Sequence, residues 1–182
     1  MELSKKICTV WRRFALRVSP RLEQRGGYAL LCLFLWSTIA FLLIQRFVVT
    51  VVVIEGRSMV PTFSPGDRCI VNCLLPHFRQ YERGDLVVVR DPLEGEMMVK
   101  RIIGLPKDRI QLREGHVYIN GRVLDEPYLP PANYTYSRQF QSQLIQVAEG
   151  SYFLLGDNRL WSYDSRAYGD VHRSLLVGLI SN

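Results

Sequence analysis

The sequence predicts a mainly β protein, in which an antiparallel β-barrel or sandwich domain follows one N-terminal transmembrane helix. Three observations support this fold class. An uncharged apolar run follows a basic N-terminal segment, short runs rich in Val and Ile recur between turn residues, and Asn120-Gly121 separates two alternating segments. The 182 residues are enough for one compact domain and a short appendage.

Residues 1–27 form a basic segment with seven basic and two acidic residues, a net charge of +5. The rest of the chain has sixteen basic and fifteen acidic residues, so the total of +6 resides almost entirely in this segment. A nucleic-acid-binding domain would spread its basic residues over the folded body. The charge distribution therefore indicates a cytoplasmic tail at a membrane and no nucleic-acid partner.

The apolar run begins at Tyr28 and carries no charge as far as Ile44. It approaches the length that spans about 30 Å of hydrocarbon, and Gln45 and Arg46 can snorkel before an apolar continuation to Val49. A buried core helix would have a polar face, and a cleaved signal peptide would end in small residues. We therefore expect residues 28–49 to be an uncleaved anchor in the lipid bilayer, with the N-terminus cytoplasmic and residues 50–182 extracytoplasmic.

Residues 50–182 are expected to form the β-rich domain. Asn120-Gly121, between His116–Ile119 and Arg122–Leu124, is a strong hairpin pattern with a two-residue turn. The expected strands are Val48–Ile54, Cys69–Leu75, Leu86–Val89, Met97–Ile103, Arg109–Leu112, His116–Ile119, Tyr152–Leu155 and Leu175–Ile180.

Residues 125–147 have a different composition, with three prolines and many Tyr, Gln and Ser residues, and are expected to form an extended surface excursion. Cys69 and Cys73 are four residues apart in an expected strand, about 13 Å, which is too far for a disulfide. No Cys/His pattern has zinc spacing. The sequence therefore predicts no disulfide framework, no metal and no cofactor.

Lysine is the more informative candidate for a catalytic base. From residue 46 onward the chain has fourteen arginines but only two lysines, Lys100 and Lys107. Arginine stays protonated, whereas a buried lysine can lose its proton near neutral pH. Lys100 and Arg101 occupy an apolar strand, where alternation places them on opposite faces and one must point inward. A solvent-facing Lys100 remains the alternative.

Ser58 follows an apolar strand in Glu55-Gly56-Arg57-Ser58-Met59-Val60-Pro61 and is a possible nucleophile. A polar turn residue is the alternative interpretation. The three histidines lie in no distinctive motif, although a Ser-His-Asp triad stays open. The individual residues thus support a Ser-Lys pair only weakly.

Three segments taken together resemble type I signal peptidases: EGRSMVPTFSPGD around Ser58, VKRIIGLPKDRI around Lys100, and GDNRLWSYDSRAYG over residues 156–169. The resemblance covers the chain after residue 48 in order. It implies a membrane-bound serine endopeptidase that removes signal peptides from exported preproteins after small residues, through an acyl-enzyme.

Carried over by position, the resemblance makes Ser58 the nucleophile and Lys100 the general base. It implies that Ser162 helps to orient the lysine and that Asp164 and Arg166 form a supporting ion pair. The backbone N–H of Ser58 would bind the oxyanion. Beside the dyad, Met59 and Val99 are expected to line the substrate pockets.

Two departures from the family pattern stand out. Gly56 occupies a position where some members have a serine that supplies a second oxyanion donor, and Lys107 replaces a glycine. Gly156, Asp157 and Asn158 are expected to form an ordinary turn.

Other functions stay open, including a Ser-Lys peptidase dedicated to one partner in conjugation or organelle import, a self-cleaving repressor-type peptidase and a non-catalytic anchored β module. The expected location is the bacterial inner membrane, with a single pass, and the mitochondrial inner or thylakoid membrane is the alternative. The protein is expected to act as a monomer.

Overall fold

The computed structural model describes residues 27–42, 49–131, 133–137 and 143–181. The chain consists of two compact units, Met1–Gln45 and Arg46–Asn182. In the first unit, residues 27–42 form a helix with mostly exposed side chains. Within the described ranges, no helix has both the length and the apolarity needed to cross a membrane. Residues 1–26 of the expected basic segment and 43–48 of the expected anchor lie outside the described residues.

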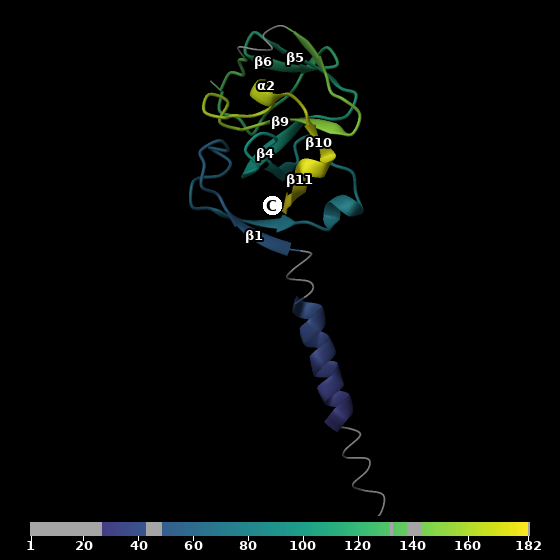
Figure 1. Ribbon diagram of the computed structural model, residues 1–182. Coiled ribbons are helices and arrows are strands. Elements are labelled where there is room, and N and C mark those ends of the chain that lie inside the picture. Colours follow the sequence, from purple (N-terminus) through teal and green to yellow (C-terminus); the bar gives the residue numbers. More distant parts are fainter. Residues whose placement is uncertain (1–26, 43–48, 132, 138–142, 182) are drawn as a thin grey trace, which may run out of the picture. The chain divides into compact units, whose positions relative to one another are not determined.

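The second unit is built from antiparallel strands, which confirms the mainly β prediction (Figure 1). Its described strands form two sheets, ordered β1-β2-β11-β3-β4-β9-β10 and β7-β6-β5-β8, rather than one closed barrel. The elements are β1 (Val49–Val53), β2 (Arg68–Asn72), η1 (Leu75–His77), β3 (Leu86–Arg90), β4 (Met97–Gly104), β5 (Arg109–Arg113), β6 (His116–Ile119), β7 (Arg122–Val123), β8 (Leu144–Gln146), β9 (Ser151–Leu155), α2 (Ser165–Tyr168), β10 (Val171–His172), η2 (Arg173–Leu175) and β11 (Leu176–Ser181).

The predicted hairpin is confirmed. Strands β6 and β7 pair so that Ile119 lies opposite Arg122, and only Asn120 and Gly121 connect them. Both connecting residues have positive φ, 52° and 83°, as a type I′ turn requires. This turn also orders its surroundings, because the Asn120 side chain donates a hydrogen bond to Asp108 at 2.8 Å.

The segment 125–147 is more integrated into the fold than we expected. Leu144–Gln146 forms β8 and pairs with β5, while Thr135 and Ser137 are buried. The expectation of a surface excursion stays a prediction for the segment as a whole, and residues 132 and 138–142 lie outside the described residues. Short β8 and β10 escaped prediction because neither has the alternating apolar pattern that marks a longer strand.

The core lies on both faces of the larger sheet. In β3 the side chains alternate between two apolar clusters: Leu86 and Val88 pack on one face with Met59 and Val99, and Val87 and Val89 pack on the other. A third cluster joins the two sheets through side chains of β4, β5, β6 and β9, namely Ile103, Ile110, Leu112, Val117, Phe153 and Leu155. Figure 1 shows β5 and β6 at the end of this unit that lies away from β1. Side chains from both faces of β3 and β4 are therefore packed into the core.

Lys107 occupies the turn between β4 and β5 with φ of 73°, a left-handed conformation that favours glycine. The turn nevertheless forms, and the backbone N–H of Lys107 donates a hydrogen bond to the carbonyl of Val147 at 3.0 Å. The Lys107 amine makes an exposed ion pair with Glu149. The departure at Lys107 therefore leaves the path of the chain after β4 intact.

Candidate active site

Ser58 lies in the loop that follows β1, and backbone hydrogen bonds close this loop on both sides of the serine. The Ile54 N–H donates to Asp67 O at 2.8 Å, and the Phe63 N–H donates to Met59 O at 2.9 Å. The neighbouring Met59 side chain is only 1% exposed and packs into the core. The buried methionine thus anchors the loop, while Ser58 itself stays partly accessible.

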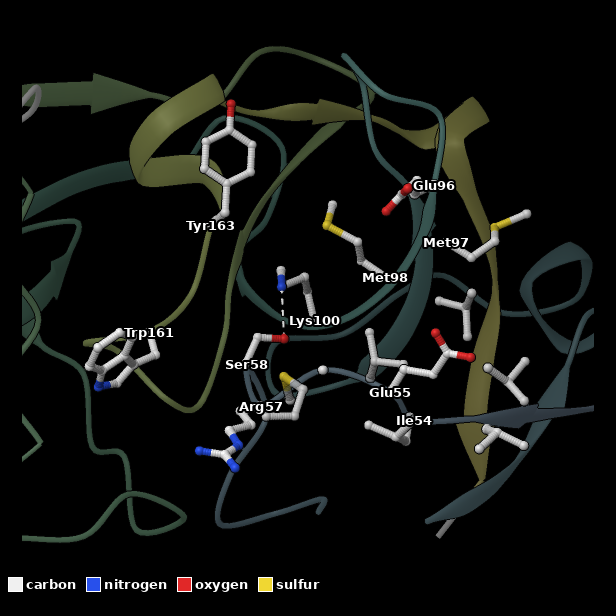
Figure 2. A pocket seen from close by; sticks show the side chains of 16 residues that line it. Ile54, Glu55, Arg57, Ser58, Glu96, Met97, Met98, Lys100, Trp161 and Tyr163 are labelled. Atoms are coloured by element: carbon white, nitrogen blue, oxygen red, sulfur yellow. Dashed lines mark hydrogen bonds between the residues drawn. The ribbon is translucent and has the colours of Figure 1, made fainter. Parts of the chain in front are cut away.

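Lys100 reaches Ser58 from β4. Its Nζ lies 3.0 Å from Ser58 Oγ, and the two side chains point toward each other in Figure 2. The lysine is 2% exposed, and desolvation by burial lowers the pKa of its amine; Arg166 lowers this pKa further, while Asp164 and Asp91 oppose the shift. A lysine with a lowered pKa can accept a proton from a hydroxyl at this distance.

Both Lys100 and its neighbour Arg101 are buried, so the alternative of a solvent-facing Lys100 does not hold. Arg101 is 8% exposed. The structure covers both faces of β4 at this point, so alternation sends the two side chains to different buried sites. One site contains Ser58 and the other contains Asp157.

Asp164 and Arg166 form an ion pair beside the lysine. Arg166 donates through Nε at 2.8 Å and through Nη2 at 2.9 Å to the two carboxylate oxygens of Asp164. Asp164 is fully buried. The Asp164 carboxylate also accepts a hydrogen bond from the Gly156 N–H at 3.0 Å. As the N-cap of α2, it accepts another from the Arg166 N–H at 3.2 Å. The Asp164 carboxylate raises the pKa of Lys100 against the effect of burial.

Ser162 has a buried hydroxyl that, among the described residues, makes no hydrogen bond. A hydrogen bond to Lys100 is therefore not formed in this structure.

A Cβ on Gly156 would lie 2.2 Å from Ser162 Oγ and 2.5 Å from the Ser58 carbonyl oxygen. Glycine at 156 thus allows the third segment to pack closely against the Ser58 loop.

Asp157 is a residue whose importance we missed. It is fully buried, and its carboxylate accepts hydrogen bonds from Arg101 Nε at 2.9 Å and Nη2 at 2.6 Å. Thr62 of the Ser58 loop also donates to this carboxylate, and Arg101 stacks on the Tyr128 ring at 3.9 Å. The segment bends here as expected, but Asp157 is more than an ordinary turn residue, because it forms a buried ion pair with Arg101. The signal was present in Arg101, because a charged residue inside an apolar strand requires a buried partner.

The neighbours of Asp157 extend this network. Asn158 donates to the Ser58 carbonyl through its N–H at 2.9 Å and to the Arg57 carbonyl through Nδ2 at 3.1 Å. On the other side, buried Arg159 pairs with Glu126. Residues 156–159 therefore connect the backbone of the Ser58 loop with the segment after β7.

The Ser58–Lys100 contact opens into a pocket of about 530 Å³ (Figure 2). One wall is the end of β1 and the loop after it; the other is the start of β4. Both residues that we expected to contact substrate, Met59 and Val99, line the pocket, and Trp161 and Tyr163 come from the third segment. Among the described residues, no group of His, Cys, Asp and Glu side chains could hold a metal ion.

A hydroxyl beside a desolvated amine, in a pocket open to solvent, is an arrangement suited to acyl transfer by a serine hydrolase. Comparison with known proteins gives the family. Residues 28–181 match the model of the family "Signal peptidase, peptidase S26". The chain belongs to this family, and it is a serine peptidase.

Two bacterial relatives agree with this family assignment. The chain is 33% identical over 138 residues to signal peptidase I V of Bacillus subtilis, covering 71% of this chain and 82% of that protein. It is 40% identical over 143 residues to probable signal peptidase I-2 of Synechocystis, covering 74% of this chain and 62% of that protein. A crystal structure of a signal peptidase I from Enterococcus faecalis is 34% identical and covers 57% of this chain and 98% of that one, with a TM-score of 0.49.

Proposed function

We propose that this protein is a membrane-bound endopeptidase that removes N-terminal signal peptides from exported preproteins, with Ser58 as nucleophile and Lys100 as general base. The 3.0 Å contact between Ser58 Oγ and the buried amine of Lys100 carries the proposal. Family membership supports the substrate class, and Asp164 and Arg166 serve as a supporting ion pair near Lys100.

The reaction proceeds in two acyl-transfer steps. Neutral Lys100 takes the Ser58 proton as Oγ forms a bond to the scissile carbonyl carbon. The backbone N–H of Ser58 donates a hydrogen bond to the oxyanion. Among the described residues, no acceptor takes a hydrogen bond from this N–H. Protonated Lys100 then gives its proton to the leaving amine, the peptide bond breaks and an ester remains. Lys100 next deprotonates a water molecule, which releases the acid and regenerates Ser58.

The substrate binds as an added strand. Strand β9 pairs with β4 at Arg101 and beyond, so the pocket side of Met97–Lys100 has no strand partner among the described residues. An extended peptide can hydrogen-bond to this edge while its side chains alternate into the pocket. Met59 and Val99 border the space beside the dyad, where small residues at the first and third positions before the cut fit.

Residues 28–49 anchor the enzyme in the bilayer, with the basic segment 1–27 in the cytoplasm and residues 50–182 on the other side. The composition of these segments supports this topology, and the bacterial relatives support the bacterial inner membrane as the location. The enzyme acts as a monomer, since Ser58, Lys100, Asp164 and Arg166 all come from one chain.

Incubation with a preprotein tests the function directly. The native protein is expected to release the signal peptide and the mature chain, whereas Ser58→Ala should lower the cleavage rate at least about 10³-fold because no hydroxyl remains to form the ester. Gel analysis and mass spectrometry of the mature N-terminus measure both rate and cleavage site. Cleavage at an unchanged rate by Ser58→Ala would contradict the assignment.

Cleavage is expected to rise with pH, because only the neutral form of Lys100 accepts the Ser58 proton. Burial lowers the pKa of this lysine below its ordinary value of 10.5, so the neutral form becomes the major one at a lower pH than for an exposed lysine. The logarithm of kcat/KM should rise with unit slope and level off above this pKa. A profile that stays flat from pH 6 to 10, with chemistry rate-limiting, would argue against lysine as the base.

A further inference from the structure

The pocket carries negative charge at one end, and the reaction does not use this charge. Glu55 lies three residues before Ser58, Glu96 lies four residues before Lys100, and both line the pocket from opposite walls. In the view of Figure 2 both lie to one side of the Ser58–Lys100 contact, and Trp161 lies to the other. Both glutamates are exposed, and among the described residues neither carboxylate has an ion-pair or hydrogen-bond partner.

The spacing of these residues places the charge along the path of a bound peptide. At about 3.3 Å per extended residue, Glu96 lies roughly 13 Å along the chain from Lys100. Glu55 lines the wall across the pocket, in the loop that leads to Ser58. A peptide whose scissile carbonyl meets Ser58 Oγ would run along the unpaired edge of β4 between them. Its residue at the fourth or fifth position from the cut then lies near both carboxylates.

We infer that Glu55 and Glu96 are specificity-determining residues. They favour substrates with a lysine or arginine at the fourth or fifth position from the cut. The position is counted on the side of the cut that binds at this end of the pocket. The inference rests on the proposed peptidase function. Opposite charges attract the basic side chain, and the same two carboxylates repel an acidic one. Because both glutamates are exposed, salt should weaken the selection.

The test uses the full chain in detergent and synthetic peptides that span a signal-peptide cleavage site. The peptides carry Lys, Gln or Glu at the fourth or fifth position on either side of the cut, and kcat/KM is measured for each. On one side of the cut, we expect the Lys peptide to be cleaved roughly tenfold faster than the Glu peptide, with Gln between them. In the double variant Glu55→Gln/Glu96→Gln the ratio should fall to about one.

Glu94→Gln is the matched control. It removes a negative charge two residues from Glu96, and Glu94 does not line the pocket. It should keep the native ratio. Equal cleavage of all peptides by the native protein, an unchanged ratio in the double variant, or an equal loss in Glu94→Gln would overturn the inference and leave the peptidase function standing. Failure to cleave any peptide or preprotein would overturn both.

Discussion

Replacing Lys100 is expected to abolish signal-peptide cleavage, with a loss of roughly 10³–10⁴-fold in kcat. Lys100→Met is the most informative change, since it keeps the apolar stem that packs beside β3 and removes only the amine. Lys100→Arg should be equally inactive, because a guanidinium stays protonated and cannot accept the Ser58 proton. Preprotein cleavage at the pH plateau, together with a thermal melt to establish folding, measures the effect.

Lys107→Ala provides the control for Lys100. It removes the other lysine beyond residue 45. The Lys107 side chain is 70% exposed and forms an ion pair with Glu149, so the cleavage rate should stay within about twofold of native. Replacing His77, His116 and His172 together should also leave cleavage intact. A Lys100→Met protein that still cleaves, or a histidine variant that does not, would favour a histidine-based site.

Replacing Asp157 is expected to cause the largest loss of stability. Asp157→Ala leaves the buried guanidinium of Arg101 without its carboxylate, which should lower the free energy of unfolding by about 3–5 kcal/mol. Cleavage should fall as well, because Thr62 loses a partner that ties the Ser58 loop to β4. Urea denaturation measures the stability, and preprotein cleavage under native conditions measures the activity.

A double variant separates the ion pair from simple loss of packing. Arg101→Met/Asp157→Leu removes both charges, so it should be less destabilised than Asp157→Ala alone. Glu149→Ala is the exposed counterpart, because it breaks the ion pair with Lys107, and it should change the free energy of unfolding by at most about 1 kcal/mol. A loss below about 1 kcal/mol for Asp157→Ala would show that the buried ion pair contributes little.

Much of the fold was predictable, because period-two alternation and turn chemistry are local properties. The hairpin at Asn120-Gly121 and the expected strands from Val48–Ile54 to Leu175–Ile180 correspond to strands of the structure within a few residues. Strands β8 and β10 were missed. Each has three residues or fewer and exists because a neighbouring strand supplies hydrogen-bond partners, which local sequence does not reveal.

The candidate site residues were proposed on other grounds, and their roles stay predictions. The rarity of lysine after residue 45 singled out Lys100, and the three ordered motifs linked it with Ser58. Gly56 still offers no hydroxyl for an oxyanion, and the roles of Ser162 and Arg166 remain predictions. Asp157 was overlooked because a Gly-Asp-Asn segment has the composition of an ordinary turn.

The sequence by itself determined the β class of the domain, the turn positions, the charge asymmetry of the N-terminus and the shortage of candidate bases. Only the tertiary structure decided that Lys100 contacts Ser58, 42 residues away, and that Arg101 pairs with Asp157, 56 residues away. The reason is physical. Burial lowers the pKa of an amine and makes an unpaired guanidinium costly, and burial arises only when segments distant in sequence pack over both faces of β4.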